Sequence, residues 1–327
     1  MSPDKQITTW RLALTSLEEG IPVLLLYVLE SRGSSPGRQG FFMVVNAKGG
    51  IEGSIGGGIM EHKFAEMARE LLEQGDATLS IRRQVHDKTV TKDRSGMICS
   101  GEQTILLYTL REQDRMVVGE MVDCLSVGRN GTLRLSPAGI GFSSQAPPVD
   151  FSFVRSSDED WIYEEKAGYK HHLFIVGGGH CALAFSRVMR MMDFRISIFD
   201  HRPELDTLSR NDNVHEKVFV KDYGELRERI SSGVHSHYIV VMTQGYRTDD
   251  QAVRALLDKE FRYFGLLGSS AKFGKLLADY RAEGVAEALL GKIRSPAGLS
   301  IHSQTPEEIA ISIAAEIIQV KNEGGGL

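Results

Sequence analysis

The sequence predicts an α/β protein in which a C-terminal, doubly wound parallel sheet follows an N-terminal α+β domain. Three observations predict this fold. From about residue 170 onward, short apolar runs alternate with helical patterns, which is typical of a parallel sheet covered on both faces by helices. The first of these runs ends in a glycine turn, Gly177-Gly178-Gly179. The 327 residues also correspond to about two domains of roughly 150 residues each.

The N-terminal half has a mixed pattern. Short apolar runs bounded by Gly or Pro predict buried strands at residues 21–29 and 41–45. Apolar residues at helical spacing predict a helix over 60–72 that Gly75 ends. Further strands are expected at 104–108, 151–154 and 161–163, and Asn130-Gly131 predicts a hairpin with a strand at 132–135 beyond it.

The C-terminal half is expected to alternate strands with helices. Apolar runs predict strands at 173–176, 195–199, 217–220, 238–242 and 263–267. Helical stretches lie near 181–192, 223–231 and 249–260. A polar segment with two prolines separates the halves, and we place the boundary so that the domains are 1–165 and 166–327.

The first glycine turn of the second half carries a ligand-binding pattern. Gly177, Gly179 and Ala182 fit G-x-G-x-x-A between a strand and a helix, and Asp200 ends the next strand 23 residues after Gly177. This pattern is typical of a Rossmann-like fold that binds a nucleotide or similar phosphate at the helix N-terminus, with the acid on a ribose. A Rossmann-like domain that is only a scaffold is the alternative.

Loops after later strands are expected at the same edge of the sheet. Arg247 could reach an anionic ligand or only be solvated, and Ser269 could contact a ligand or simply cap the next helix. His180 begins the helix after the glycine turn. We therefore count these three residues as candidates for the site.

The first half contains a second glycine loop that opens a helix. Gly56, Gly57 and Gly58 permit the backbone conformations of an anion-binding nest, with a plain tight turn as the alternative. Glu61 follows in the first helical turn. Among three cysteines, Cys99 is flanked by Ser100 and Gly101 and is expected to be accessible, whereas Cys124 and Cys181 lie in helical stretches and are expected in the core.

Charge and hydropathy exclude several classes of protein. The 43 acidic and 38 basic residues give a net charge of −5 without a basic block, which argues against nucleic-acid and anionic-membrane surfaces. The longest apolar run, 21–29, is far shorter than the roughly 18 residues of a membrane span. We therefore expect a cytoplasmic protein.

Taken together, the loops resemble the XdhC/CoxI family, the xanthine dehydrogenase accessory factors. The resemblance runs almost end to end. It includes Gly33-Ser34-Ser35-Pro36, Gly53-Ser54-Ile55-Gly56-Gly57-Gly58 with Glu61, Met97-Ile98-Cys99, 173–180, Asp200-His201-Arg202-Pro203, Gly265-Leu266-Leu267-Gly268-Ser269 with Lys272, Pro296-Ala297-Gly298-Leu299 and 305–316. In the last segment, Thr305, Pro306 and Glu308 also predict a capping box at the start of a helix.

The resemblance implies an accessory protein that is not itself the dehydrogenase. Such a protein binds molybdenum cofactor (molybdopterin), holds it during sulfuration and delivers it to a xanthine dehydrogenase-type molybdoenzyme of purine catabolism. A cysteine desulfurase is then a further expected partner, and a homodimer the expected assembly. The expected cofactor-binding residues are Gly56, Gly57, Gly58, Glu61, Cys99, Gly177, Gly179, His180, Asp200, Arg247 and Ser269, with Cys99 as the thiolate on molybdenum.

Two other functions stay open at this point. Gly177, Gly179 and Asp200 alone would suit an oxidoreductase with a nucleotide cofactor such as NAD(P), and the chain could also be a purely structural interaction protein. The sequence also departs from the family pattern in four places. Ile59 stands where many members have Cys, Ser100 replaces a Gly, Thr243-Gln244-Gly245-Tyr246 replaces a Thr-His-x-His loop, and His302 stands where Gly is usual.

Overall fold

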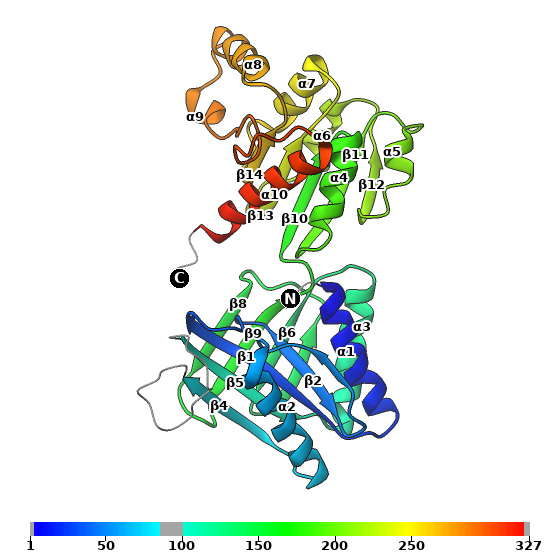
Figure 1. Cartoon of the computed structure of the whole chain (residues 1–327), viewed down its shortest axis with the longest axis vertical. Helices are drawn as coiled ribbons and strands as arrows, with labels where there is room; N and C mark the ends of the chain where they lie inside the picture. The colour runs from blue at the N-terminus through cyan, green and yellow to red at the C-terminus, as the bar shows by residue number, and fades with distance from the viewer. Residues whose placement is uncertain (1–2, 86–100, 324–327) are drawn as a thin grey trace. The chain divides into compact units, whose positions relative to one another are not determined.

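The computed structural model describes residues 3–85 and 101–323. The chain divides into two compact units, one up to Tyr169 and the other from Lys170 (Figure 1). Among the helices of these described residues, none combines the length and apolarity needed to cross a lipid bilayer.

Within its described residues, the first unit contains two antiparallel sheets. The larger has the strand order β3-β2-β1-β5-β4 and the smaller β7-β6-β9-β8. The strands are β1 (Val23–Gly33), β2 (Phe42–Asn46), β3 (Ile51–Gly53), β4 (Leu79–Val85), β5 (Gly101–Thr109), β6 (Gly131–Ser136), β7 (Gly139–Ser143), β8 (Phe151–Arg155) and β9 (Trp161–Ala167). The helices are α1 (Pro3–Glu18), α2 (Gly58–Glu73), the 3-10 turn η1 (Glu112–Asp114) and α3 (Arg115–Ser126).

Strand β1 is buried on both faces, which explains the unbroken apolar run in the sequence. Leu24, Leu26 and Val28 pack with the apolar face of α2, whereas Leu25 and Tyr27 pack into the core on the other side. Side chains alternate between the two faces of a strand, so a strand between two layers needs apolar residues at every position. The larger sheet is thus the central layer of this unit.

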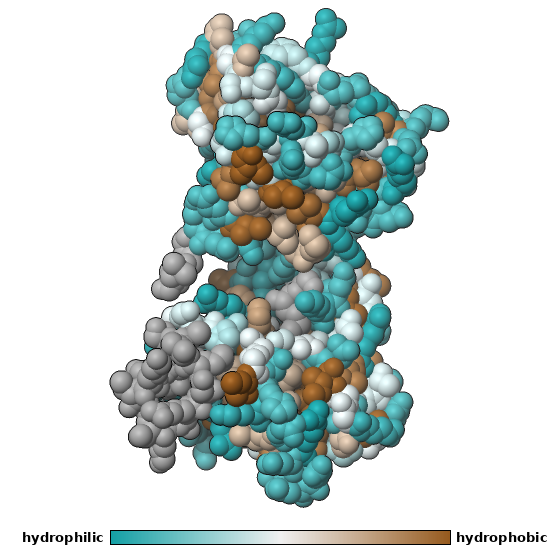
Figure 2. Space-filling model, viewed as in Figure 1, coloured by the Kyte–Doolittle hydropathy of each residue, from teal (hydrophilic) through white to brown (hydrophobic). Residues whose placement is uncertain are grey.

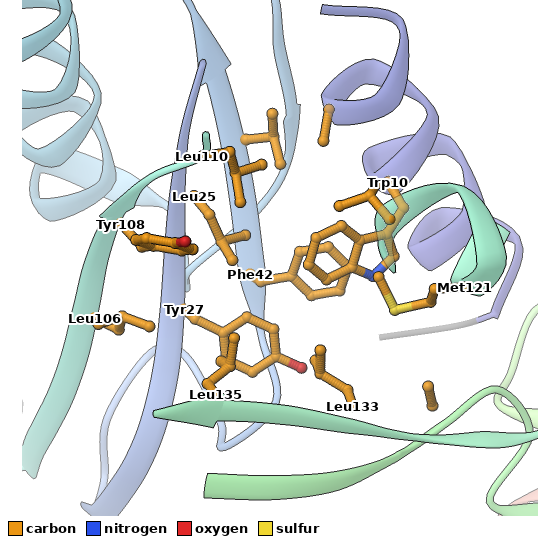
Figure 3. Close-up of a cluster of buried hydrophobic side chains, with 14 of the residues drawn as sticks. Trp10, Leu25, Tyr27, Phe42, Leu106, Tyr108, Leu110, Met121, Leu133 and Leu135 are labelled. Carbon is orange, nitrogen blue, oxygen red and sulfur yellow. The ribbon is translucent and has the colours of Figure 1, made fainter. Parts of the chain in front are cut away.

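The core on the second face joins the two sheets (Figure 3). Trp10 of α1 packs on Phe42 of β2 with ring centroids 4.8 Å apart. Phe42 is in turn stacked on Tyr27 at 5.2 Å, and Leu133 and Leu135 of β6 close this core from the smaller sheet. Burial of these large side chains is what holds the two sheets together.

The hairpin expected at Asn130-Gly131 is wrong. Gly131 begins β6 directly after α3, so this dipeptide links a helix to a strand. The Asn130 side chain is also engaged elsewhere, since it donates to the carbonyl of Tyr169 and accepts from its N–H, both at 2.8 Å. The actual hairpin follows β6 and returns through β7.

The second unit confirms the predicted parallel, doubly wound sheet. Its strand order is β12-β11-β10-β13-β14, and every pair is parallel. The strands are β10 (His171–Val176), β11 (Phe194–Asp200), β12 (Glu216–Phe219), β13 (Gly233–Val241) and β14 (Phe261–Leu266). The helices are α4 (His180–Met189), α5 (Asp206–Ser209), η2 (Tyr223–Glu225), α6 (Leu226–Arg229), α7 (Tyr246–Leu256), α8 (Ser270–Ala282), α9 (Glu287–Leu290) and α10 (Pro306–Asn322).

Helices cover both faces of this sheet, as Figure 1 shows. One core contains residues of α4 and α10, and the other contains residues of α6, α7 and α8. The strand order reverses between β10 and β13, which are neighbours in the sheet while their connections run to opposite sides. In such sheets the crevice at this switch point is where ligands bind.

The start of helix α10 agrees with the prediction from the sequence. Thr305 Oγ1 accepts from the Glu308 N–H at 3.2 Å, and Glu308 Oε2 accepts from the Thr305 N–H at 3.1 Å, which is the predicted capping box. His302 has a φ of 58°, in the left-handed region that favours glycine. Glycine would adopt this backbone conformation without strain.

Candidate functional site

Four loops meet at the carboxyl edge of the parallel sheet, because the carboxyl ends of parallel strands lie at one edge. We call this group the carboxyl-edge site. Its loops are Gly177–Gly179 after β10, Asp200–Arg202 after β11, Thr243–Gly245 after β13, and Gly268–Ser269 after β14. Three of the predicted residues, Gly177, Gly179 and Asp200, lie in the first two loops.

The glycine turn is fixed at its start and open at its end. Gly177 has a φ of 105°, and a Cβ atom there would lie 2.5 Å from the Met242 carbonyl oxygen, so only glycine fits. Gly178 donates to Asp200 Oδ2 at 2.6 Å. At Gly179 a Cβ atom would meet no atom within 4 Å. Gly179 is the N-cap of the ten-residue helix α4 and has no capping side chain, so the helix N-terminus faces open space there.

Asp200 is completely buried behind this turn. Oδ2 accepts from the Gly178 N–H and from Arg202 Nη2 at 2.8 Å, and Oδ1 accepts from the Arg202 N–H and Nε, both at 2.9 Å. Burial alone would raise the pKa of Asp200, but the hydrogen bonds from Arg202 and Gly178 outweigh it and lower the pKa. A ribose hydroxyl would have to compete with Arg202 for this carboxylate, so in this geometry Asp200 positions the turn.

Arg202 is the site residue that the sequence interpretation did not select. Its guanidinium holds Asp200 with two nitrogens, and Nη1 donates to Gln244 Oε1 at 2.8 Å. The side chain is 28% exposed. Arg202 therefore spans the loops after β11 and β13 and places a guanidinium that is paired with Asp200 at the switch point. Its position two residues after a strand-ending Asp was the available signal.

A second cation lies between the loops after β13 and β14. The Lys272 ammonium pairs with Asp249, which is 1% exposed, while Thr243 donates to the same carboxylate through its N–H at 3.2 Å and Oγ1 at 2.5 Å. Ser269 accepts from the Lys272 N–H and caps α8, the simpler of its two expected roles. Arg247 and His180 are exposed in the first turns of α7 and α4.

In the first unit, the small-residue loops lie side by side. Gln103 Nε2 donates to the carbonyls of Gly37 at 2.9 Å and Ile55 at 3.3 Å. A Cβ atom on Gly37 would lie 1.9 Å from the Ile55 oxygen, and one on Gly101 would lie 2.6 Å from the Ser34 carbonyl. The loops around residues 33–37 and 53–58 therefore form one structure, which the buried side chain of Gln103 holds together.

The carboxylate of Glu61 occupies the Gly56–Gly58 loop, where the sequence predicted a site for a bound anion. Glu61 Oε2 accepts from the N–H groups of Ile55 and Gly57, both at 3.0 Å, and from Ser54 Oγ at 2.5 Å. The three glycines have φ values of 131°, 78° and 71°, which residues with a side chain rarely adopt. Glu61 folds back from the first turn of α2 because the helix N-terminus attracts a carboxylate. These backbone donors are thus already engaged.

The cysteine prediction is tested only in part. Cys99 lies outside the described residues. Cys124 is buried in α3 and Cys181 is partly buried in α4, and burial raises the pKa of both thiols. Both thiols are therefore poor metal ligands, because only a thiolate binds a metal well. Within the described chain, no group of three or more His, Cys, Asp or Glu residues could hold a metal ion.

Two cavities lie elsewhere among the described residues. One of about 460 Å³ lies over β6 and β7, beside the ion pair of Arg134 with Glu164. Another of about 400 Å³ is lined by His172, Ser197, Glu216 and His237. Burial and the nearby His237 lower the pKa of His172 to about 3, so this histidine is neutral and only hydrogen-bonds Ser197 at 2.8 Å.

The parallel sheet, its switch point and the glycine turn define the second unit as a Rossmann domain. Residues 173–317 match the family described as "XdhC Rossmann domain", and residues 16–83 match the "XdhC and CoxI family". The chain belongs to the XdhC/CoxI family. The second of these matches lies in the first unit of the chain and the other in the second unit.

Relatives of known sequence or structure extend over nearly the whole chain. It is 24% identical over 314 residues to "Uncharacterized protein YqeB" of Escherichia coli, covering 94% of this chain but 45% of that protein. It is 24% identical over 323 residues to a probable xanthine dehydrogenase subunit of Bacillus subtilis, covering 93% of this chain and 95% of that protein. A crystal structure of a xanthine dehydrogenase from Bacillus halodurans has the same fold, with a TM-score of 0.70, 24% identity, and coverage of 99% and 97%.

Proposed function

We propose that this chain is an accessory factor that binds molybdenum cofactor and delivers it, after sulfuration, to a xanthine dehydrogenase-type molybdoenzyme. The observation that carries the proposal is the open glycine turn beside the anchored Arg202 at the carboxyl-edge site. Membership of the XdhC/CoxI family and the name of the Bacillus subtilis relative, a probable xanthine dehydrogenase subunit, support it. The partner is then the molybdoenzyme, with a cysteine desulfurase as the sulfur source.

The described residues fit the anionic part of this cofactor. The backbone N–H groups at Gly179 and His180, at the N-terminus of α4, would bind its phosphate. Arg202 and Lys272, each paired with a buried aspartate, would add N–H donors on either side of the switch point. When bound, the cofactor brings the molybdenum centre at which the target enzyme does its redox chemistry, and we propose Cys99 as the soft ligand that holds this metal.

One observation weighs against the alternative of an NAD(P)-dependent oxidoreductase. Rossmann dehydrogenases use the acid at the end of the second strand to bind the adenosine ribose. Here that acid is Asp200, which is completely buried and accepts hydrogen bonds from Gly178 and Arg202 on both oxygens. The phosphate-binding turn remains accessible while the ribose-binding carboxylate does not, so we favour a ligand that needs only the turn.

Substitution of Gly179 tests the proposed site. We expect Gly179→Leu to reduce the pterin and molybdenum that co-purify with the full-length chain by at least about tenfold, since a side chain there fills the space a phosphate needs. The fold should be retained, because a Cβ atom at Gly179 meets nothing within 4 Å. The protein is purified from a host that makes the cofactor, and molybdenum and oxidised pterin are measured per mole of chain.

Gly274→Leu is the matched control. Gly274 lies in α8 of the same unit, and a Cβ atom there also meets nothing within 4 Å. We expect this variant to retain the wild-type cofactor content. Equal loss in both variants, or none in Gly179→Leu at matched folding, would contradict the assignment. Tightly bound NAD(H) in place of pterin in the wild-type chain would support the oxidoreductase.

A further inference from the structure

Helix α10 carries an exposed apolar stripe. Ile311 is 54% exposed and Ile318 is 37% exposed, and the half-buried Ala315 lies between them on the same face. Ile313, Ile317 and Val320 of the same helix are buried in the core that also contains α4. Figure 2 shows hydrophobic side chains gathered over this helix. The stripe is therefore a second apolar face, in addition to the one that packs on the sheet.

The segment before α10 extends the stripe. Leu299 is 39% exposed and Ile301 is 48% exposed. Ser312 Oγ donates to the Leu299 carbonyl at 2.6 Å, which holds this segment against the helix. Exposed apolar side chains that gather at one helix mark an interaction site more often than scattered single residues do.

The charges at the ends of α10 indicate what covers the stripe. Exposed Glu307 lies in the first turn and Lys321 in the last turn. If a second copy of α10 packs antiparallel, Ile311 faces Ile318 of the other copy while Glu307 faces Lys321. The first pair is centred between Ala314 and Ala315 and the second on Ala314, so one two-fold axis near this point brings the apolar and the charged contacts together to within one residue of register. We propose that this stripe is an isologous interface between two copies of the chain.

The geometry of a helix pair suits this arrangement. A helix of 17 residues is about 25 Å long, and a small residue at the crossing point lets two helices approach to about 8–10 Å. Ala315 supplies that small residue. A shallow crossing of about 20° keeps both ends in contact, and antiparallel helices place each positive N-terminus beside a negative C-terminus.

Sedimentation equilibrium of the full-length chain tests the interface. We expect a dimer for the wild type and a rise of at least about 100-fold in the dissociation constant for Ile311→Asp, because the two-fold axis buries the new carboxylate twice. Met116→Asp is the matched control, since Met116 is an apolar helical residue of the first unit that is 74% exposed. A monomeric wild type, or an Ile311→Asp variant that still dimerises, would overturn the proposal.

Cross-linking tests the register. With a short bismaleimide, a mixture of Ile311→Cys and Ile318→Cys chains should cross-link, whereas each variant alone should do so no more than the wild type with its native cysteines. A parallel pair would instead cross-link Ile311→Cys to itself, and no cross-link in any sample would exclude the interface. Lys321→Glu should weaken the dimer, and adding Glu307→Lys to the same chain should restore it, because the charge pair is then reversed.

Discussion

Glu61 and Asp200 are two carboxylates that hold glycine loops of this chain in place. Glu61 lies inside its nest and accepts from the N–H groups of Ile55 and Gly57. Asp200 instead lies behind its turn and accepts from Gly178, which leaves Gly179 beside open space. Two loops of similar composition therefore differ in geometry, because the chain fills one with its own carboxylate and leaves open space beside the other.

Removing the Glu61 carboxylate should both destabilise the first unit and create an anion site. We expect Glu61→Ala to lower the free energy of unfolding by about 1–2 kcal/mol, since Glu61 is half-buried and accepts three hydrogen bonds. Phosphate should then raise the melting temperature of the variant more than that of the wild type, because the backbone donors are freed. Thermal unfolding in phosphate and in chloride at equal ionic strength measures both effects.

Glu70→Ala serves as the control for that experiment. Glu70 is an exposed carboxylate on the same helix, so its removal should change the free energy of unfolding by less than about 0.5 kcal/mol. It should not alter the response to phosphate. If Glu61→Ala and Glu70→Ala behave alike, the nest is not held by Glu61.

The low pKa of Asp200 predicts a particular dependence of stability on pH. A carboxyl whose pKa is lower in the folded state stabilises the protein above its unfolded-state pKa of about 3.9 and loses that effect as pH falls toward the folded value. We expect Asp200→Asn to lower the free energy of unfolding by about 2–3 kcal/mol at pH 7. The difference from the wild type should be constant above about pH 5 and shrink below about pH 4.

Urea unfolding at several pH values between about 3 and 7 measures this difference. The substitution keeps the shape of the side chain, so altered packing contributes little to the result. A difference between variant and wild type that stays the same down to the lowest pH would mean that Asp200 is not the group that titrates. The sequence could predict an acid at this position, but not its burial, because burial depends on Arg202 folding back over it.

At the scale of elements, the helix α10 has the clearest sequence signal. Thr305→Ala should lower the free energy of unfolding by about 1 kcal/mol, because the Glu308 N–H loses its acceptor. Thr305→Ser should keep most of the stability, since serine can accept the same bond. Denaturant unfolding of the three proteins checks the order. Equal stability of Thr305→Ala and wild type would show that water replaces the cap without cost.

Elements with strong local patterns were predictable, and those set by distant contacts were not. Central strands of the second unit such as β10 and β11 were predictable because buried parallel strands are short, continuous apolar runs. The hairpin at Asn130-Gly131 was wrong because a turn dipeptide does not show whether the preceding element is a strand or a helix. Here Asn130 binds the backbone of Tyr169, 39 residues later, which no local pattern reveals.

For the whole molecule, the decisive prediction concerns Cys99, which lies outside the described residues. If Cys99 binds the metal, Cys99→Ala should reduce the molybdenum retained by the full-length chain at least several-fold while leaving thermal stability and pterin content less affected. Cys181→Ala is the control, because burial raises the pKa of the Cys181 thiol and makes it a poor ligand. Elemental analysis and thermal unfolding are measured on the same preparations.

Two outcomes of the cysteine experiment are informative. Equal molybdenum in Cys99→Ala and wild type at matched folding would remove the thiol from the proposed function, without affecting the phosphate site. Loss of molybdenum and pterin together would show that the thiol holds the whole cofactor. The family resemblance suggested this residue, and nothing in residue spacing alone would have distinguished it from a solvent-exposed cysteine.

The bridge from Asp200 through Arg202 to Gln244 has a consequence for the kinetics of binding. An arginine side chain that is free in solution carries about 2 kcal/mol of rotamer entropy, and here three of its nitrogen atoms are already fixed. An anionic group that arrives at this turn would therefore meet a preorganised charge and immobilise little of the protein. Because Asp200 offsets the charge of Arg202, long-range attraction would contribute little, and the association rate should depend on ionic strength only weakly.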